Sequence, residues 1–171
     1  MVPMNWPAIG FTILPNLGGI AGGFITRPQI DKWYQTLNRP SWRPPNWAFG
    51  PVWTSLYCSM GYASYIVYRD GGGFEGAARL PLAVYGANLV ANWAWTPIFF
   101  GAKNIKLALY EMQIINITAV GMACLFYQVN PHAGLLIVPY CLWLSLATAL
   151  NYVMYRDNKD NKPKITELKD N

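Results

Sequence analysis

Three tryptophans offer the clearest chemistry in this chain, because each lies in a separate stretch without charged residues. Trp53, Trp95 and Trp143 each present a broad aromatic face for stacking on a flat ligand and one N–H group to orient it. The small residues that accompany them in the apolar stretches are Gly23, Gly50 and Ala147. This set predicts an interior cavity for a flat hydrophobic ligand. A packed, tryptophan-rich core is the alternative that the residues leave open.

Groups for acid–base, nucleophilic or metal-assisted catalysis are scarce in the sequence. The single histidine, His132, lies in a short turn without an acidic residue nearby, and the three cysteines are too scattered for a CxxC motif. Glu111 is the only candidate for an intramembrane charge, and we expect it to reach the interface or to pair with Lys103 or Lys106. We therefore expect no catalytic residue, no metal and no cofactor, and the composition argues against a pump or an ion channel.

The stretch 150–156 fits a pattern proposed for sterol binding, in which Leu or Val is followed by Tyr and then by Lys or Arg. Leu150 would contact the apolar body of the sterol, Tyr152 would supply a ring, and Arg156 would meet the hydroxyl group at the membrane interface. The pattern is common, so alone it is a weak indication.

The distribution of charge shows which elements must position these residues. The 171 residues are 53% hydrophobic and 12% charged, whereas a soluble domain averages about 25% charged residues. No Asp, Glu, Lys or Arg occurs in four spans, which are 1–26, 44–68, 80–102 and 112–155. Because a membrane crossing takes about 20 residues, the last span is long enough for two crossings with a turn at 131–134.

The spans predict an all-α integral membrane bundle of five transmembrane helices in one domain, 1–157. The expected helices cover about 6–26, 46–68, 80–101, 106–127 and 135–155. Four crossings are the alternative, if 1–26 lies on the membrane surface. With five crossings, 11 Lys and Arg residues fall on one side and 2 on the other, which places the C-terminus in the cytosol. We expect no nucleic-acid partner, because the basic residues lie in short loops.

Several local features refine this expectation. We expect residues 27–45 to form a cytosolic loop stiffened by prolines, with a short amphipathic helix over 30–37, which acts either as a lid or as an anchor of Trp and Arg at the headgroups. We expect 158–171 to form a flexible tail. Asn88 and Asn92 share one face of the third helix, which must turn inward because amides are costly in lipid. Small residues from Gly18 to Gly23 allow close packing, with a ligand-facing notch or dimerisation as alternatives, and Pro139 is expected to kink the last helix.

Together these residues resemble the TspO/MBR family, also called the translocator protein family or the peripheral-type benzodiazepine receptors. The resemblance runs from about Trp6 to Asp157 and is most specific in three stretches. These are PSWRPP at 40–45, NWAWTPIFFG at 92–101, and ATALNY at 147–152 with its continuation to Arg156 and Asp157. The Lys-rich tail and the sterol pattern look like those of an animal member.

The resemblance implies a receptor or translocator in the mitochondrial outer membrane, with a cytosolic C-terminus and no enzymatic activity. Implied ligands are cholesterol, porphyrins such as protoporphyrin IX and haem, and drug-like benzodiazepine-site compounds. The implied role is in mitochondrial cholesterol transport and in steroid and tetrapyrrole metabolism. Implied partners are membrane lipid, an outer-membrane channel and a second copy of the chain. By analogy, Ala83 and Ala87, which recur at helical spacing, would form the dimer contact.

The resemblance also implies the site residues. Ligand-pocket positions map onto Gly23, Phe49, Gly50, Trp53, Trp95, Leu107, Trp143, Ala147 and Leu150, and sterol positions onto Leu150, Tyr152 and Arg156. Leu107 stands where mammalian members have Trp, and Gly23 and Gly50 stand where they have Ala, so the pocket would be roomier. Two other functions stay open, which are a porphyrin-degrading photo-oxidative enzyme that uses Trp53 and Trp143, and a scaffold with a regulatory pocket.

Overall fold

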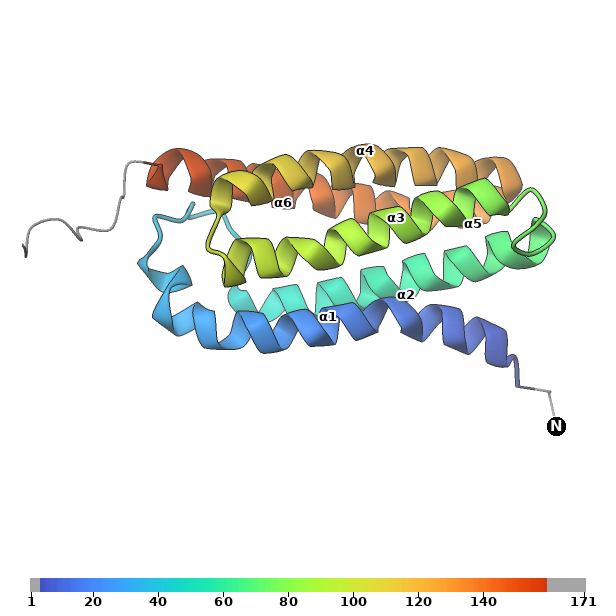
Figure 1. Cartoon of the computed structure of the whole chain (residues 1–171), viewed down its shortest axis with the longest axis horizontal. Coiled ribbons are helices and arrows are strands. Elements are labelled where there is room, and N and C mark those ends of the chain that lie inside the picture. The colour runs from blue at the N-terminus through green and yellow to red at the C-terminus, as the bar shows by residue number, and fades with distance from the viewer. Residues whose placement is uncertain (1–3, 160–171) are drawn as a thin grey trace, which may run out of the picture.

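The protein is a bundle of five long helices that run side by side along one axis (Figure 1). The structure, a computed structural model, describes residues 4–159, so the predicted tail lies outside the described residues from position 160 onward. The long helices are α1 Trp6–Lys32, α2 Asn46–Asp70, α3 Arg79–Thr96, α4 Ile105–Val129 and α6 Val138–Asn158. Shorter elements are a 3-10 turn at Tyr34–Thr36, a π-helical turn at Pro97–Gly101 and α5 Pro131–Leu135. No strand occurs in the described residues, so the predicted all-α five-helix transmembrane bundle is confirmed.

The outer surface of the bundle is apolar, as a lipid environment requires. Three segments are long and apolar enough to cross a membrane by length and composition, which are Trp6–Lys32, Ile105–Val129 and Pro131–Asn158. Only 6% of the apolar window of α1 is buried inside the protein, although this window has a mean hydropathy of 1.5. An apolar helix that keeps most of its side chains outside the fold needs lipid around it.

Helix α1 packs mainly against α2, and α3 and α6 both pack against α4. The α1–α2 contact is close at Gly61 of α2, where an added Cβ would lie 2.8 Å from the Cα of Thr12. On the other side of α1, a Cβ at Gly18 would collide with the Trp93 ring of α3, and one at Gly22 would touch Thr96. These glycines therefore serve helix packing, the first of the alternatives that the sequence left open.

Buried polar side chains link four helices through the centre of the bundle. The Tyr57 hydroxyl of α2 donates to Oδ1 of Asn92, whose Nδ2 donates to the Tyr140 hydroxyl of α6 over 3.0 Å. Tyr140 in turn donates to Asn88 Oδ1 over 2.9 Å. Nδ2 of Asn88 reaches α4, at the Ile115 carbonyl oxygen (2.9 Å) and at Thr118 Oγ1 (2.8 Å). The inward orientation predicted for Asn88 and Asn92 is confirmed.

Three local expectations were wrong, each for a backbone reason. No separate helix covers 30–37, because α1 continues to Lys32 and a single 3-10 turn follows. Pro139 does not kink α6, since it lies in the first turn, where its missing N–H is not needed. The third helix does not remain an α-helix to residue 101, because it passes into the π-helical turn at Pro97.

Candidate ligand site

Two of the three predicted tryptophans lie in one aromatic cluster. The Trp53 ring of α2 meets the Trp143 ring of α6 edge to face, with centroids 6.4 Å apart and an interplanar angle of 89°. Phe49, one turn before Trp53, approaches Trp143 at 5.6 Å. The indole nitrogen of Trp143 is buried and has no hydrogen-bond partner among residues 4–159. A buried donor without an acceptor is rare in folded proteins, so this nitrogen is a candidate contact for a ligand.

The third tryptophan belongs to a neighbouring cluster at the end of α3. Trp95 stacks on Phe99 with centroids 4.7 Å apart, and its indole N–H donates to Oδ1 of Asn151 over 3.2 Å. Trp33 meets Phe99 edge to face at 5.5 Å, and Tyr34 packs there too. Unlike Trp143, Trp95 already has its acceptor, so its role in this arrangement is packing rather than hydrogen bonding to a ligand.

The segment after α1 covers this second cluster and is fastened to the end of α6. Tyr34 is 8% exposed, and burial raises the pKa of its hydroxyl, although Arg43 and Arg39 act in the opposite direction. The Asn38 backbone N–H donates to Oδ1 of Asn158 (2.9 Å), and Nδ2 of Asn158 donates back to the Asn38 carbonyl oxygen (2.9 Å). The loop is therefore a cover held by specific bonds over the aromatic end of the bundle.

The remaining pocket positions do not share one environment. Gly23 and Gly50 face open space, with no heavy atom within 4 Å of an added Cβ beyond their own helix. Ala147 is half-buried and packs on the main core, whereas Leu150 is buried in the Trp95 cluster. Leu107 is 49% exposed, and the structure does not bring it into either aromatic cluster.

A separate groove of about 510 Å³ lies between α4 and α6. Its walls combine apolar and hydroxyl-bearing side chains, which are Leu109, Tyr110, Gln113, Ser145, Thr148, Ala149 and Tyr152. Sequence reasoning found Tyr152 but missed the residues of α4, because nothing in the chain indicates which helix lies beside α6.

The three residues of the sterol pattern do not form one surface. Leu150 is 4% exposed and points into the core, while Tyr152 is 53% exposed and lines the groove. Residues i and i+2 of a helix lie about 200° apart around its axis, so the side chains of Leu150 and Tyr152 point to different sides. Arg156 is exposed and forms an ion pair with Asp157. The groove and the pattern thus share Tyr152 alone.

Comparison with known proteins decides the family. The sequence model of the TspO/MBR family matches residues 11–156. The chain belongs to the TspO/MBR family. It is 44% identical over 158 residues to a protein from Homo sapiens named "Translocator protein", covering 92% of this chain and 94% of that protein. It is 38% identical over 156 residues to the "Tryptophan-rich sensory protein" of Cereibacter sphaeroides, covering 91% and 94%.

Within this TspO/MBR chain, Glu111 does not take either of its expected partners. It forms no ion pair with Lys103 or Lys106 in the described part of the chain, and its Oε2 atom is buried without a hydrogen bond. A buried carboxyl oxygen without a hydrogen bond destabilises the folded state, and no contact of this atom offsets that cost.

We expect Glu111→Leu to stabilise the protein by about 1 kcal/mol, because it replaces an unsatisfied polar group with an apolar one. Thermal unfolding of the purified protein in detergent would measure this. The matched control is Gln113→Leu on the same helix, which removes an exposed amide instead. A lower unfolding temperature for Glu111→Leu would show that the carboxyl group makes a contact that stabilises the fold.

Proposed function

We propose that this TspO/MBR protein is a membrane receptor or translocator that binds flat hydrophobic ligands without covalent chemistry. The ligand class that best suits the aromatic clusters comprises porphyrins, such as protoporphyrin IX and haem, and drug-like aromatic compounds. The observation that carries the proposal is the buried, unpartnered indole N–H of Trp143 beside Trp53 and Phe49. A carbonyl or carboxylate oxygen of a ligand would accept a hydrogen bond from this N–H, while the rings of the ligand stack on the indoles.

The cover over the aromatic end supports the same proposal. Tyr34 and Trp33 close that end from a loop, and a loop can open where a helix of the bundle cannot. Two side-chain amides, those of Asn38 and Asn158, fasten it, so opening costs these exposed hydrogen bonds and the packing of Tyr34 on Phe99. Gly50, one turn before Trp53, is exposed, and no heavy atom lies within 4 Å of a Cβ added there.

We expect Trp143→Phe to weaken binding of protoporphyrin IX roughly fivefold, because one hydrogen bond contributes about 1 kcal/mol. Titration followed by Soret absorbance would measure this. The unfolding temperature should fall only through the smaller ring, which packs less on Trp53 and Phe49, since the lost N–H has no partner inside the described protein. Trp47→Phe is the control, because Trp47 is 76% exposed at the start of α2. Unchanged affinity in Trp143→Phe would remove this indole from the site.

The same variant tests the enzymatic alternative, which the edge-to-face pair of Trp53 and Trp143 favours. Illuminated protein would be incubated with protoporphyrin IX and dioxygen, and the porphyrin products analysed. Degradation that disappears in Trp143→Phe but survives in Trp47→Phe would favour an enzyme over a receptor. Binding without degradation would support the receptor.

A second ligand class, sterols, is proposed for the groove between α4 and α6. Its apolar walls suit a sterol body, and Ser145, Thr148 and Gln113 offer partners for a hydroxyl group. We expect Ala149→Trp to fill the groove and abolish labelling of α4 and α6 by a photoreactive cholesterol analogue. Labelling that persists in Ala149→Trp would place the sterol elsewhere.

The proposed setting is the mitochondrial outer membrane with the C-terminus in the cytosol, as the excess of basic residues on that side supports. We also propose a homodimer formed through α3. Ala83 and Ala87 are exposed on the bundle, next to Leu80 and Val90, which are 61% and 64% exposed. Small side chains on an exposed face let a second helix approach closely.

A further inference from the structure

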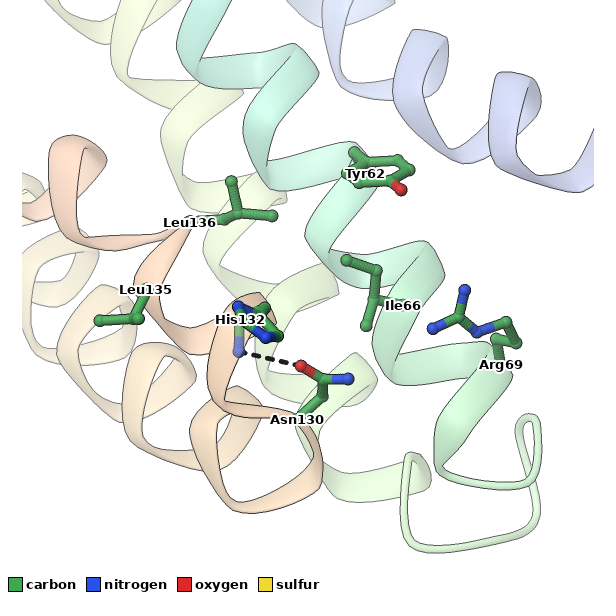
Figure 2. A pocket seen from close by; sticks show the side chains of 7 residues that line it. All are labelled: Tyr62, Ile66, Arg69, Asn130, His132, Leu135 and Leu136. Carbon is green, nitrogen blue, oxygen red and sulfur yellow. Dashed lines mark hydrogen bonds between the residues drawn. The ribbon is translucent and has the colours of Figure 1, made fainter.

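A second pocket, of about 480 Å³, lies at the end of the bundle away from the Trp95 cluster, and Figure 2 shows the side chains around it. It sits between the last turns of α2 and the α5 segment. The residues around it are Tyr62, Ile66, Arg69, Asn130, His132, Leu135 and Leu136. None of them belongs to the proposed porphyrin or sterol sites.

The lining of this pocket changes from apolar to polar along α2. Figure 2 shows Tyr62, then Ile66, then Arg69 on successive turns, with Leu136 beside the apolar part and Asn130 beside the polar part. The change falls at the membrane boundary, because the charge-free span 44–68 ends one residue before Arg69. Tyr62 and Leu135 are 45% and 58% exposed, so the apolar part is open to lipid. The pocket therefore has an acyl-chain end and a headgroup end.

The polar end holds the ion pair of Arg69 and Asp70 and presents hydrogen-bond donors beside it. Arg69 uses Nε and Nη2 to bind the carboxylate of Asp70, and its Nη1 makes no hydrogen bond to residues 4–159. Asn130 also donates to Asp70, with Nδ2 2.7 Å from Oδ2, and accepts the backbone N–H of His132 at Oδ1 over 2.9 Å. Asp70 is thus occupied by two donors. The Nη1 group of Arg69 and the imidazole of His132, which carries an N–H in either protonation state, remain as donors.

We propose that this pocket binds an anionic phospholipid from the surrounding membrane, with the phosphate at Arg69 and His132 and an acyl chain along Tyr62, Ile66 and Leu135. Charge complementarity supports this occupant, since a guanidinium and an imidazole N–H both suit phosphate oxygens. The depth supports it too, because phosphates of a bilayer lie just outside the hydrocarbon layer, where Arg69 stands. The Asp70 carboxylate is already bonded by Arg69 and Asn130, so the choline group of a zwitterionic lipid finds no free anion at this end.

The test uses the full chain, purified and placed in nanodiscs of phosphatidylcholine with a minor fraction of phosphatidylglycerol. Native mass spectrometry would measure which lipid stays bound after the surrounding lipid is removed. We expect the wild-type protein to favour phosphatidylglycerol about twofold over its share of the bilayer, because the carboxylate of Asp70 offsets part of the roughly fivefold effect of one cation at a membrane surface. Arg69→Gln should reduce this preference to near parity.

Arg79→Gln is the matched control, because Arg79 starts α3 at the same end of the bundle but does not line the pocket. It should keep the preference. Leu135→Trp fills the apolar end of the pocket without changing the charge, so it should abolish retention of phosphatidylglycerol. This second variant tests the proposal even if Arg69→Gln folds poorly. Inorganic phosphate added in excess should not displace the lipid. Equal loss in Arg79→Gln, intact preference in Leu135→Trp or displacement by phosphate would each overturn the proposal.

Discussion

Gly61→Ala is expected to lower the free energy of unfolding by about 3 kcal/mol and to loosen α1 from the bundle, the upper end of the range for overpacking. The added Cβ would collide with the Phe11 carbonyl oxygen and lie 2.8 Å from the Cα of Thr12. Both neighbours are backbone atoms of α1, so no side chain can rotate away to relieve the contact. One helix must move relative to the other.

The consequence would spread along α1, because this helix depends on close packing with α2 and α3. Only 6% of its apolar window is buried, so it has few buried side chains to hold it if the backbone contact opens. Thermal unfolding in detergent would measure the loss, and limited proteolysis would show whether α1 is released first. Gly10→Ala on the same helix is the control, since nothing lies within 4 Å of an added Cβ there. It should stabilise α1 slightly through higher helix propensity. Equal stability of the two variants would mean that α1 and α2 can separate without cost.

Much of the architecture followed from the sequence because the membrane limits the options. Four charge-free spans of known length predict five helices, and the cost of amides in lipid predicts that Asn88 and Asn92 face inward. These inferences need only the length and polarity of each segment. They do not need to know which helices are neighbours.

The site was harder to predict, because a site depends on neighbours. The tryptophan stretches indicated aromatic contacts, yet the orphan N–H of Trp143 and the satisfied N–H of Trp95 differ only through Asn151, 56 residues from Trp95. Gly61 resembles several other helical glycines in the sequence, and its close contact appears only once α1 is placed beside it. The groove between α4 and α6 was missed for the same reason.

Asn88→Ala is the second substitution with a large expected effect, again about 3 kcal/mol of unfolding free energy. Asn88 is fully buried and makes three hydrogen bonds, to Tyr140, to the Ile115 carbonyl oxygen and to Thr118. Hydrogen bonds between helices in a bilayer contribute about 0.6 kcal/mol each, and the cavity left by the amide adds roughly 1 kcal/mol. Asn116→Ala is the matched control, because Asn116 is partly exposed and makes one bond to another helix, at Thr148 Oγ1. It should cost about 1 kcal/mol.

A double-mutant cycle would show whether Asn88 stabilises the bundle through its hydrogen bonds to other buried polar side chains or through the volume of its own side chain alone. In Asn88→Ala the Tyr140 hydroxyl keeps the bond from Asn92 but loses the acceptor for its own proton. Tyr140→Phe removes that hydroxyl, so the double variant should be more stable than the two single losses predict by about 0.6 kcal/mol. Strict additivity would instead assign the effect of Asn88→Ala to the cavity. The hydrogen-bonded side chains run from Tyr57 to Thr118. Positive coupling would therefore establish that one polar network sets the register of α2, α3, α4 and α6 around the aromatic clusters.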